Sequence, residues 1–207
     1  GIDDQNSKNK YFIAGLLTQP STGTYSIKLK PDGLLLNYQK WTVSPDNLIT
    51  ISPTSVTANN FVLQNGQQRL SITSQAGRVQ QPIVVNFANF RLATITGFIK
   101  ADSVLADGLI NGNVTLNNVL QQPTFTSELT INNLSLRNDT LGDAGLHIAS
   151  AGANRYNTNV TLTGRGNDVA LTGWFATAGK DVDLNLDLNV RSLQLHTMEG
   201  ATEATSH

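Results

Sequence analysis

The 207-residue sequence contains no cysteine, and only 14% of its residues are charged. Without cysteine the chain has no disulfide, no thiolate zinc site and no cysteine nucleophile. Charged residues make up about 25% of an average domain, so the polar surface here must come mainly from Asn, Thr, Ser and Gln. The formal net charge is −1. Because the Lys and Arg residues are scattered and form no stripe, nucleic acid is not expected as a partner.

Long apolar runs are also missing. A membrane-spanning helix needs about 20 predominantly apolar residues, whereas Gly33–Leu36 is among the longest apolar stretches. The N-terminus does not show the basic segment followed by an apolar segment that marks a signal peptide. We therefore expect a soluble body, with a frayed polar tail at 201–207.

No catalytic or metal-binding constellation stands out. None of the three histidines has a metal-ligand or triad-like spacing: His147, His196 and His207. Asp183 and Asp187 fit the solvent face of a strand, and no calcium-type loop surrounds them. The segment Gly164–Gly166 precedes a strand pattern rather than a helix, which indicates a turn and not a nucleotide site. We predict no enzymatic activity, no cofactor and no bound metal, and a surface position for His147.

Period-two alternation of apolar and polar residues dominates the chain and predicts antiparallel β-strands. Hairpins are predicted at Asn65-Gly66 and at 164–168. Asn132-Asn133 shifts the apolar phase, and a β-bulge there would keep the apolar residues on both sides of it on one face. Alternation assigns the following residues to a common interior face: Phe61, Leu63, Leu70, Ile72, Val114, Leu116, Leu129, Ile131, Leu134, Leu136, Val160, Leu162, Val169, Leu171, Leu184, Leu186, Leu188 and Val190.

The sequence also repeats itself, which is best sought before any motif. Four segments recur in the same order at offsets of 99 to 103 residues. They are Leu17–Pro20 with Leu120–Pro123, Asn60–Leu63 with Asn159–Leu162, Leu70–Thr73 with Val169–Thr172, and Val85–Leu92 with Leu188–Leu195. We therefore predict an all-β chain of two tandem repeats, 1–105 and 106–200, which form one continuous elongated body.

One segment breaks the alternation. Phe90–Ile99 places Leu92, Ile95 and Phe98 at helical spacing, which predicts a short helix that caps the first repeat. The second repeat begins the same pattern at Leu195–Met198 and then reaches the end of the sequence. A repeat whose last element is cut short leads us to expect further units in a longer parent protein.

Two interpretations of the apolar face stay open. It is either the closed core of a sandwich or one side of an open, curved sheet that holds acyl chains, at about 0.8 kcal/mol per buried CH₂. The two tryptophans, Trp41 and Trp174, fit ordinary core or edge positions. An alternative function, an extracellular adhesion or carbohydrate-binding β module, requires one of them to be exposed in a shallow cleft. A parallel β-helix enzyme is disfavoured by the hundred-residue period.

Several stretches resemble the C-terminal region of TamB-like proteins, in the form found in Bacteroidetes. They are Ile110–Leu116, Pro123–Ile131, Asp139–Gly142, Val160–Gly164 and Asn167–Gly173. TamB-like proteins belong to the AsmA-like superfamily of bridge-like proteins in Gram-negative envelopes. The resemblance covers about residues 25–200.

The resemblance implies a long folded-over sheet, a β-taco or β-groove, with a hydrophobic lumen. It also implies a periplasmic location, with the parent protein anchored in the inner membrane by an N-terminal helix that these residues do not include. The implied partners are an outer-membrane assembly barrel of the BamA/TamA type and either phospholipid acyl chains or nascent outer-membrane β-strands. The implied function is phospholipid transport between the membranes, outer-membrane protein assembly, or both. The aliphatic residues of the predicted interior face would line the groove.

Overall fold

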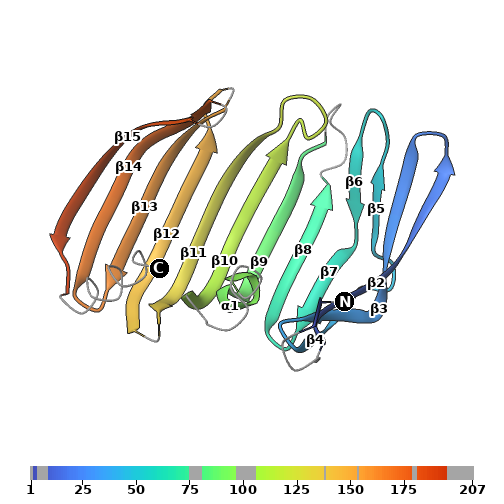
Figure 1. Ribbon diagram of the computed structural model, residues 1–207, viewed down its shortest axis with the longest axis horizontal. Coiled ribbons are helices and arrows are strands. Elements are labelled where there is room, and N and C mark those ends of the chain that lie inside the picture. The colour runs from blue at the N-terminus through green and yellow to red at the C-terminus, as the bar shows by residue number, and fades with distance from the viewer. Residues whose placement is uncertain are drawn as a thin grey trace. The chain divides into compact units, whose positions relative to one another are not determined.

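The computed structural model describes residues 2–3, 9–74, 81–96, 106–137, 139–152, 154–178 and 181–194. The chain divides into two compact units. Unit 1 comprises Gly1–Phe90 and Asn113–Pro123, and unit 2 comprises Arg91–Gly112 and Thr124–His207. The predicted boundary between residues 105 and 106 lies inside unit 2, because residues 91–112 belong to unit 2 and residues 113–123 belong to unit 1. Every strand pairing whose register is described is antiparallel, which confirms the all-β prediction (Figure 1).

The strands of unit 1 are β1 (Ile2–Asp3), β2 (Asn9–Ser21), β3 (Thr24–Leu36), β4 (Gln39–Val43), β5 (Leu48–Ile51), β6 (Val56–Asn59), β7 (Phe61–Asn65), β8 (Gln68–Ser74) and β9 (Ile83–Arg91). Unit 2 contains α1 (Leu92–Thr96), β11 (Thr124–Leu136), β12 (Asp139–Ser150), β13 (Arg155–Gly164), β14 (Asn167–Ala178) and β15 (Asp181–Ser192). Strand β10 (Ala106–Asn117) supplies residues to both units. In unit 1 the order is β1-β2-β3-β4-β7-β8-β9, and the β5–β6 hairpin pairs with β3.

The core of unit 1 forms around Trp41, which is only 1% exposed. Trp41 pairs with Leu34 on β3, and its ring lies 5.4 Å from that of Phe90, centroid to centroid. Val43 pairs with Leu63, so β4 and β7 present their buried side chains on the same face. Trp41 is therefore a core aromatic, as one of the two interpretations of the sequence predicted.

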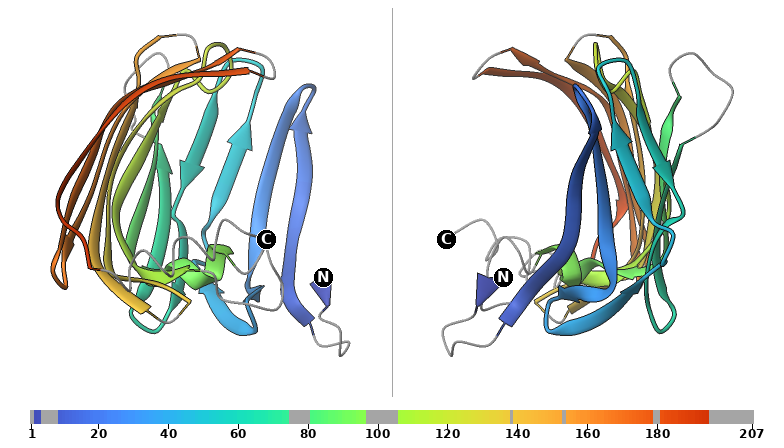
Figure 2. Two further views of the ribbon diagram at one scale, coloured as in Figure 1. Left: turned by 60° about the vertical axis from the view of Figure 1, so that its left-hand side comes forward. Right: turned by 90° about the vertical axis from the view of Figure 1, so that its right-hand side faces the viewer.

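Unit 2 is a meander of long strands, β11 to β15, in which each strand pairs with the next. Figure 2 shows these strands bowing along their length. The β13–β14 turn has Arg165 and Gly166 at φ 53° and 81°, the left-handed conformation that tight two-residue hairpins require. The β11–β12 register shifts between Ile131 and Leu134, and Asn133 has φ 52°. Both the predicted hairpin and the predicted bulge are confirmed, as is the β7–β8 hairpin at Gly66.

The sheet of unit 2 is open at β15. Among the described strands β15 pairs only with β14, and all twelve of its residues are exposed. The apolar residues of β15 therefore do not belong to a closed sandwich core. Of the two interpretations left open by alternation, the open sheet is the one found.

Two three-stranded meanders share one pairing scheme. Phe61 pairs with Ile72 in unit 1, and the residues matched to them by the sequence repeat, Val160 and Leu171, pair in unit 2. The other matched pairs also agree: Leu63↔Leu70 with Leu162↔Val169, Leu70↔Phe87 with Val169↔Val190, and Ile72↔Val85 with Leu171↔Leu188. The remaining sequence match, Leu17–Pro20 with Leu120–Pro123, does not join equivalent positions in the structure. The former lies within β2, whereas the latter lies in the turn before β11.

Helix α1 occupies part of the segment for which helical spacing predicted a short helix. Phe98, Ile99, the segment Leu195–Met198 and the tail 201–207 lie outside the described residues, so the capping role of the helix stays a prediction. Within the described ranges no helix is both long enough and apolar enough to cross a membrane.

Candidate functional site: the apolar face of unit 2

Side chains directly opposite each other in an antiparallel pair point to the same face of the sheet. The registers of unit 2 therefore align its apolar residues in transverse rows. One row is Ile131, Ala144, Leu162, Val169 and Val190. The next row is Leu129, Leu146, Val160, Leu171 and Leu188. We call the surface made by these two rows and their continuation on β12 to β15 the apolar face.

The apolar face continues toward the other end of the strands through an aromatic cluster. Tyr156 stacks on Phe175, with ring centroids 5.0 Å apart, and also contacts Phe125 at 5.4 Å. Phe175 pairs in turn with Leu184 on β15. Between the aromatic cluster and the aliphatic rows lies a row with Ile148, Thr158, Gly173 and Leu186. Aromatic side chains thus form the end of the apolar face that lies beyond the aliphatic rows.

Exposure of the apolar face increases toward β15. On β11 to β14 its aliphatic side chains are mostly half-buried between their sheet neighbours. On β15 they are 37–61% exposed: Val182, Leu184, Leu186, Leu188 and Val190. Scattered exposed apolar residues are ordinary on a protein surface, whereas a contiguous row is not, and this makes the row on β15 a candidate binding surface.

Alternation assigned a set of residues to a common interior face. Those of the set that belong to unit 2 mostly lie on the apolar face. Those on β13, β14 and β15 fall in its rows, as do Leu129 and Ile131. Leu134 rejoins the face after the bulge, since it pairs with Gly142, two residues from Ala144 on β12. Leu136 does not extend the rows, because a second irregularity follows Leu134 and sets Leu136 opposite Asp139.

The residues predicted for unit 1 belong to that unit's own sheet. Phe61 and Leu63 are buried, and Leu70 and Ile72 pair with them and are half-buried. Val114 and Leu116 are half-buried in the part of β10 that belongs to unit 1. The predicted set is therefore divided between the two units.

Sequence reasoning missed several members of the apolar face, namely Ala144, Leu146, Ile148, Tyr156 and Phe175. The spacing of Leu146 and Ile148 does fit a strand. However, the neighbouring Ala and Gly residues of β12 blur the contrast between its two faces. Only the pairing of β12 with β11 and β13 assigns these residues to a side.

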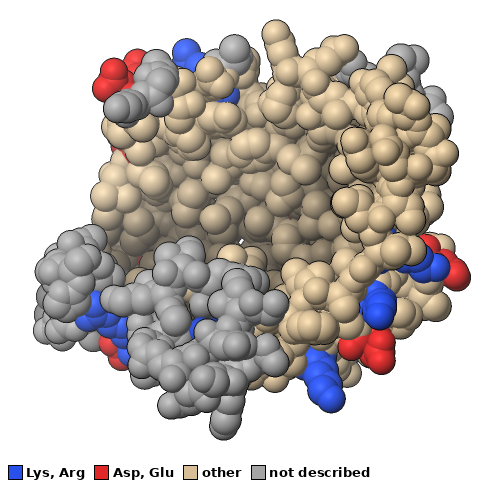
Figure 3. Space-filling model, turned by 45° about the vertical axis from the view of Figure 1, so that its right-hand side comes forward, with Lys and Arg blue, Asp and Glu red and all other residues tan. Residues whose placement is uncertain are grey.

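The opposite face of unit 2 is polar. Thr161, Thr163, Thr172 and Asn189 line a hollow of about 340 Å³ together with Asp168, Asp187 and Arg191. His147 Nδ1 lies 2.5 Å from a carboxylate oxygen of Glu128, and the His147 side chain is 46% exposed. Its predicted surface position is therefore confirmed. Figure 3 shows a surface made largely of uncharged residues, in agreement with the low charge content.

The carbohydrate-binding alternative required an exposed tryptophan. Trp41 is buried and does not meet this requirement. Trp174 is half-buried on the polar face, in register with Asn157 and Asn185. However, the guanidinium carbon of Arg155 lies 4.1 Å from the centroid of the Trp174 ring. A cation–π contact at this distance covers one face of the ring, and a sugar that stacked on that face would have to displace Arg155.

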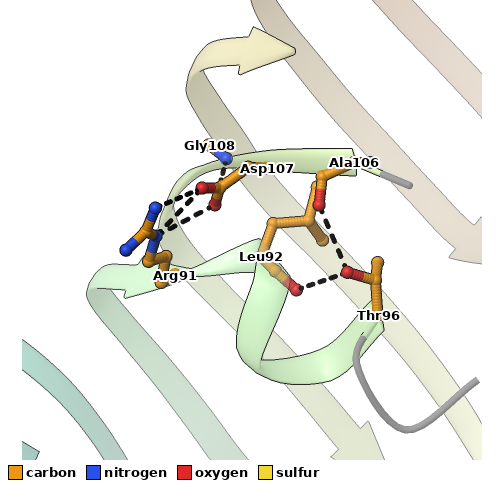
Figure 4. Close-up of polar contacts among 6 residues, drawn as sticks. All are labelled: Arg91, Leu92, Thr96, Ala106, Asp107 and Gly108. Atoms are coloured by element: carbon orange, nitrogen blue, oxygen red, sulfur yellow. Dashed lines mark hydrogen bonds and ion pairs between the residues drawn. The ribbon is translucent and has the colours of Figure 1, made fainter. Parts of the chain in front are cut away.

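A polar clamp joins α1 to the start of β10 within unit 2 (Figure 4). Arg91 donates from Nε and Nη2 to the Asp107 carboxylate, at 2.9 and 2.6 Å to Oδ2. The Gly108 amide donates to Oδ1 of the same carboxylate at 2.8 Å. The Thr96 hydroxyl lies 3.2 Å from the carbonyl oxygen of Ala106 and 3.4 Å from that of Leu92. The clamp fixes the short helix by side-chain contacts, since five residues are too few for a stable isolated helix.

The clamp also perturbs ionisation. Partial burial acts to raise the pKa of Asp107, but hydrogen bonds from Arg91 and from the Gly108 and Ala93 amides, with the charge of Arg91, outweigh it. The pKa of Asp107 therefore lies below its ordinary value. The same hydrogen bond and charge raise the pKa of Arg91.

No group of three or more His, Cys, Asp or Glu side chains in the described parts of the chain is arranged to hold a metal ion. Comparison with family models, curated proteins and solved structures found no match.

Proposed function

We propose that this chain is a periplasmic segment of a TamB-like bridge and that the apolar face of unit 2 carries phospholipid acyl chains. The observation that supports the proposal is the in-register rows of aliphatic side chains on an open sheet, exposed along β15. The aliphatic rows carry no side chain that could bind a head group. The head group would therefore stay in water while the chain lies on the sheet.

The dimensions of the face suit this ligand. Strands are spaced about 4.8 Å apart, so a row across five strands is about 19 Å long. One leaflet of a bilayer is about 15 Å of hydrocarbon, half of the roughly 30 Å core. A single acyl chain thus matches one row in length. Because burial of CH₂ groups is non-directional, the face would accept chains of different length and saturation.

We further propose that the equivalent β7-β8-β9 and β13-β14-β15 meanders are copies of one duplicated unit. The same four residue pairs occupy matching positions in both, which chance alternation alone would not require. Repetition of one sheet unit is the way a bridge gains length. In this proposal an outer-membrane assembly barrel of the BamA/TamA type is the partner, and the same apolar face would shield nascent outer-membrane β-strands.

The test compares two neighbouring positions on β14. Leu171 lies in the middle of an aliphatic row, and Thr172 points to the polar face. We expect Leu171→Asn to weaken the binding of dansyl-undecanoate, measured by fluorescence titration, at least about fivefold, because it places an amide under the chain. Thr172→Asn introduces the same side chain on the other face and should leave binding within twofold.

The same variants are then tested with natural lipid. Transfer of fluorescent phosphatidylethanolamine between donor and acceptor vesicles should be faster with wild type than without protein, and Leu171→Asn should reduce this gain. Circular dichroism must show that both variants are folded. Equal loss in the two variants, or no binding and no transfer by the wild type, would overturn the proposal.

A further inference from the structure

Among the described strands β15 is the last of the unit 2 sheet, and its outer edge is long and regular. Its pairing with β14 runs without interruption from Asp181 to Val190, and the only irregularity is at Arg191. Edge strands of soluble proteins are usually short, interrupted by proline or a bulge, or protected by charged side chains. β15 is twelve residues long and has no proline, its charged side chains alternate with the apolar ones and so lie on the polar face, and its one irregularity is near its end, at Arg191. Such an edge favours the addition of another strand.

The sequence of β15 matches its own reverse. If two copies of the strand run antiparallel with Leu186 opposite Leu186, Leu184 lies opposite Leu188 and Val182 lies opposite Val190. In the same register Asp181 lies opposite Arg191. The remaining polar pairs are Asp183 with Asn189 and Asn185 with Asp187. Every apolar side chain thus meets an apolar side chain, and each Arg meets a carboxylate.

Neighbouring registers are worse. A shift that centres the pair on Asn185 sets Asp183 opposite Asp187 twice, and a shift that centres it on Asp187 sets two copies of that residue against each other. Like charges directly opposite in a sheet are destabilising. Registers shifted by an odd number of residues place apolar side chains opposite polar ones. The Leu186-centred register is therefore the one that charge complementarity selects over the full strand.

Arg191 is placed to make the contact across the two copies. It lies on the polar face, where Nη1 is 3.5 Å from Asp168 Oδ2 and where Asp187 and Asn189 line the same hollow. At 76% exposure its guanidinium is open to a second carboxylate. An Asp181 from another copy would supply that carboxylate.

We propose that two copies of this chain associate by antiparallel pairing of β15 with β15 about a two-fold axis through Leu186. The pairing joins the two unit 2 sheets, and the two apolar faces become one surface. This inference concerns the edge that β15 presents among the described strands and is independent of whether the face binds lipid. A further sheet unit that pairs with β15 in a longer parent protein would occupy the same edge and would overturn the inference.

Charge reversal tests the register. Wild type should sediment, in analytical ultracentrifugation at low salt, with twice the 22.2 kDa mass of one chain. Asp181→Arg and Arg191→Asp each set two like-charged pairs across the axis and should weaken the dimer about tenfold or more. The double variant Asp181→Arg/Arg191→Asp restores opposite charges and should restore the dimer. Asp168→Asn removes only the contact within one copy and should leave the dimer intact.

Cysteine cross-linking tests the axis directly, since the chain has no cysteine of its own. Opposite residues of an antiparallel pair have Cα atoms about 4.5–5.5 Å apart, within reach of a disulfide. Leu186→Cys should therefore form a covalent dimer when oxidised with diamide. Asn185→Cys and Asp187→Cys should not do so alone, because each meets its own copy diagonally at about 7–8 Å. A mixture of these two variants should cross-link.

A monomeric wild type across the micromolar range would overturn the proposal. So would a dimer that neither charge reversal weakens, or one in which Asn185→Cys cross-links with itself as readily as Leu186→Cys. A wild type that stays monomeric but binds an unrelated strand peptide would show that the edge takes another partner, and it would overturn the proposal as well.

Discussion

Single polar side chains stabilise both units at the points where strands leave the regular ladder. Asn47 is fully buried in unit 1. Its amide nitrogen donates to the carbonyl oxygens of Leu29 and Ser44, at 2.9 and 2.6 Å, and its oxygen accepts from the Leu29 amide at 2.7 Å. The side chain thus binds backbone groups of β3 at Leu29, between the segment of β3 that pairs with β5 and the segment that pairs with β4.

Asn47→Ala should lower the free energy of unfolding by about 2–3 kcal/mol, because it leaves the Leu29 amide and carbonyl without these partners. The measurement is urea denaturation at neutral pH. Asn59→Ala, at an exposed position of β6, is the control and should change stability by less than about 0.5 kcal/mol. Equal effects at the two positions would contradict the role assigned to Asn47.

The lowered pKa of Asp107 predicts how the stability of the fold depends on pH. Its pKa is lowered in the folded state, so the ionised carboxylate stabilises the fold above the unfolded pKa of about 3.9. That stability is lost as pH falls through the lower, folded pKa. Asp107→Asn should therefore be less stable than wild type at pH 7, and the difference should shrink below about pH 4.

Thermal unfolding followed between pH 7 and pH 2.5 measures this difference. Asp139→Asn, at an exposed position of β12, serves as the control and should track the wild type more closely. If the difference in stability between wild type and Asp107→Asn stays constant down to pH 2.5, the charge of the Asp107 carboxylate is not what stabilises the fold.

At the scale of elements, glycines let neighbouring strands of unit 2 approach closely. Gly173 on β14 has φ +141°, and a Cβ there would lie 2.1 Å from the carbonyl oxygen of Asn185. Gly142 on β12 has φ +130° and a similar approach to the Thr163 carbonyl oxygen. A side chain at either position would have to push the neighbouring backbone away. The two glycines therefore determine how closely β12–β13 and β14–β15 pair.

Gly173→Ala should destabilise the β14–β15 pairing and increase the hydrogen exchange of β15 amides. Gly152→Ala is a matched control, because Gly152 has a similar φ of +135° but no atom within 4 Å of the added Cβ. We expect Gly173→Ala to cost at least about 1 kcal/mol more than Gly152→Ala, since both share the backbone strain and only one has the clash. Unchanged protection of β15 in Gly173→Ala would contradict this account.

At the scale of the whole molecule, the low net charge predicts that transfer depends little on the charge of the lipid head group. The net charge is −1, and the Lys and Arg residues are scattered along the sequence rather than clustered as in segments that attract anionic head groups. Under the proposed function, phospholipid transfer should therefore differ less than about twofold between phosphatidylcholine vesicles and vesicles with 30% phosphatidylglycerol. A tenfold preference for the anionic vesicles would mean that charge, not the apolar face, governs binding.

The sequence by itself determined the all-β class, the hairpins at Gly66 and Arg165-Gly166, the bulge at Asn133 and which aliphatic residues share one side of a strand. These features depend on local conformation and on the two-residue period of a strand, which any alternating segment displays.

Only the tertiary structure decided what covers each face and where the units divide. Phe61 and Leu188 alternate alike in the sequence, yet one is buried and the other is 61% exposed. Exposure depends on which strands come to lie alongside, and that is set by pairings between residues far apart in the chain. For the same reason the placing of Ala144 and Leu146, the burial of Trp41 and the open edge at β15 emerged only from the fold.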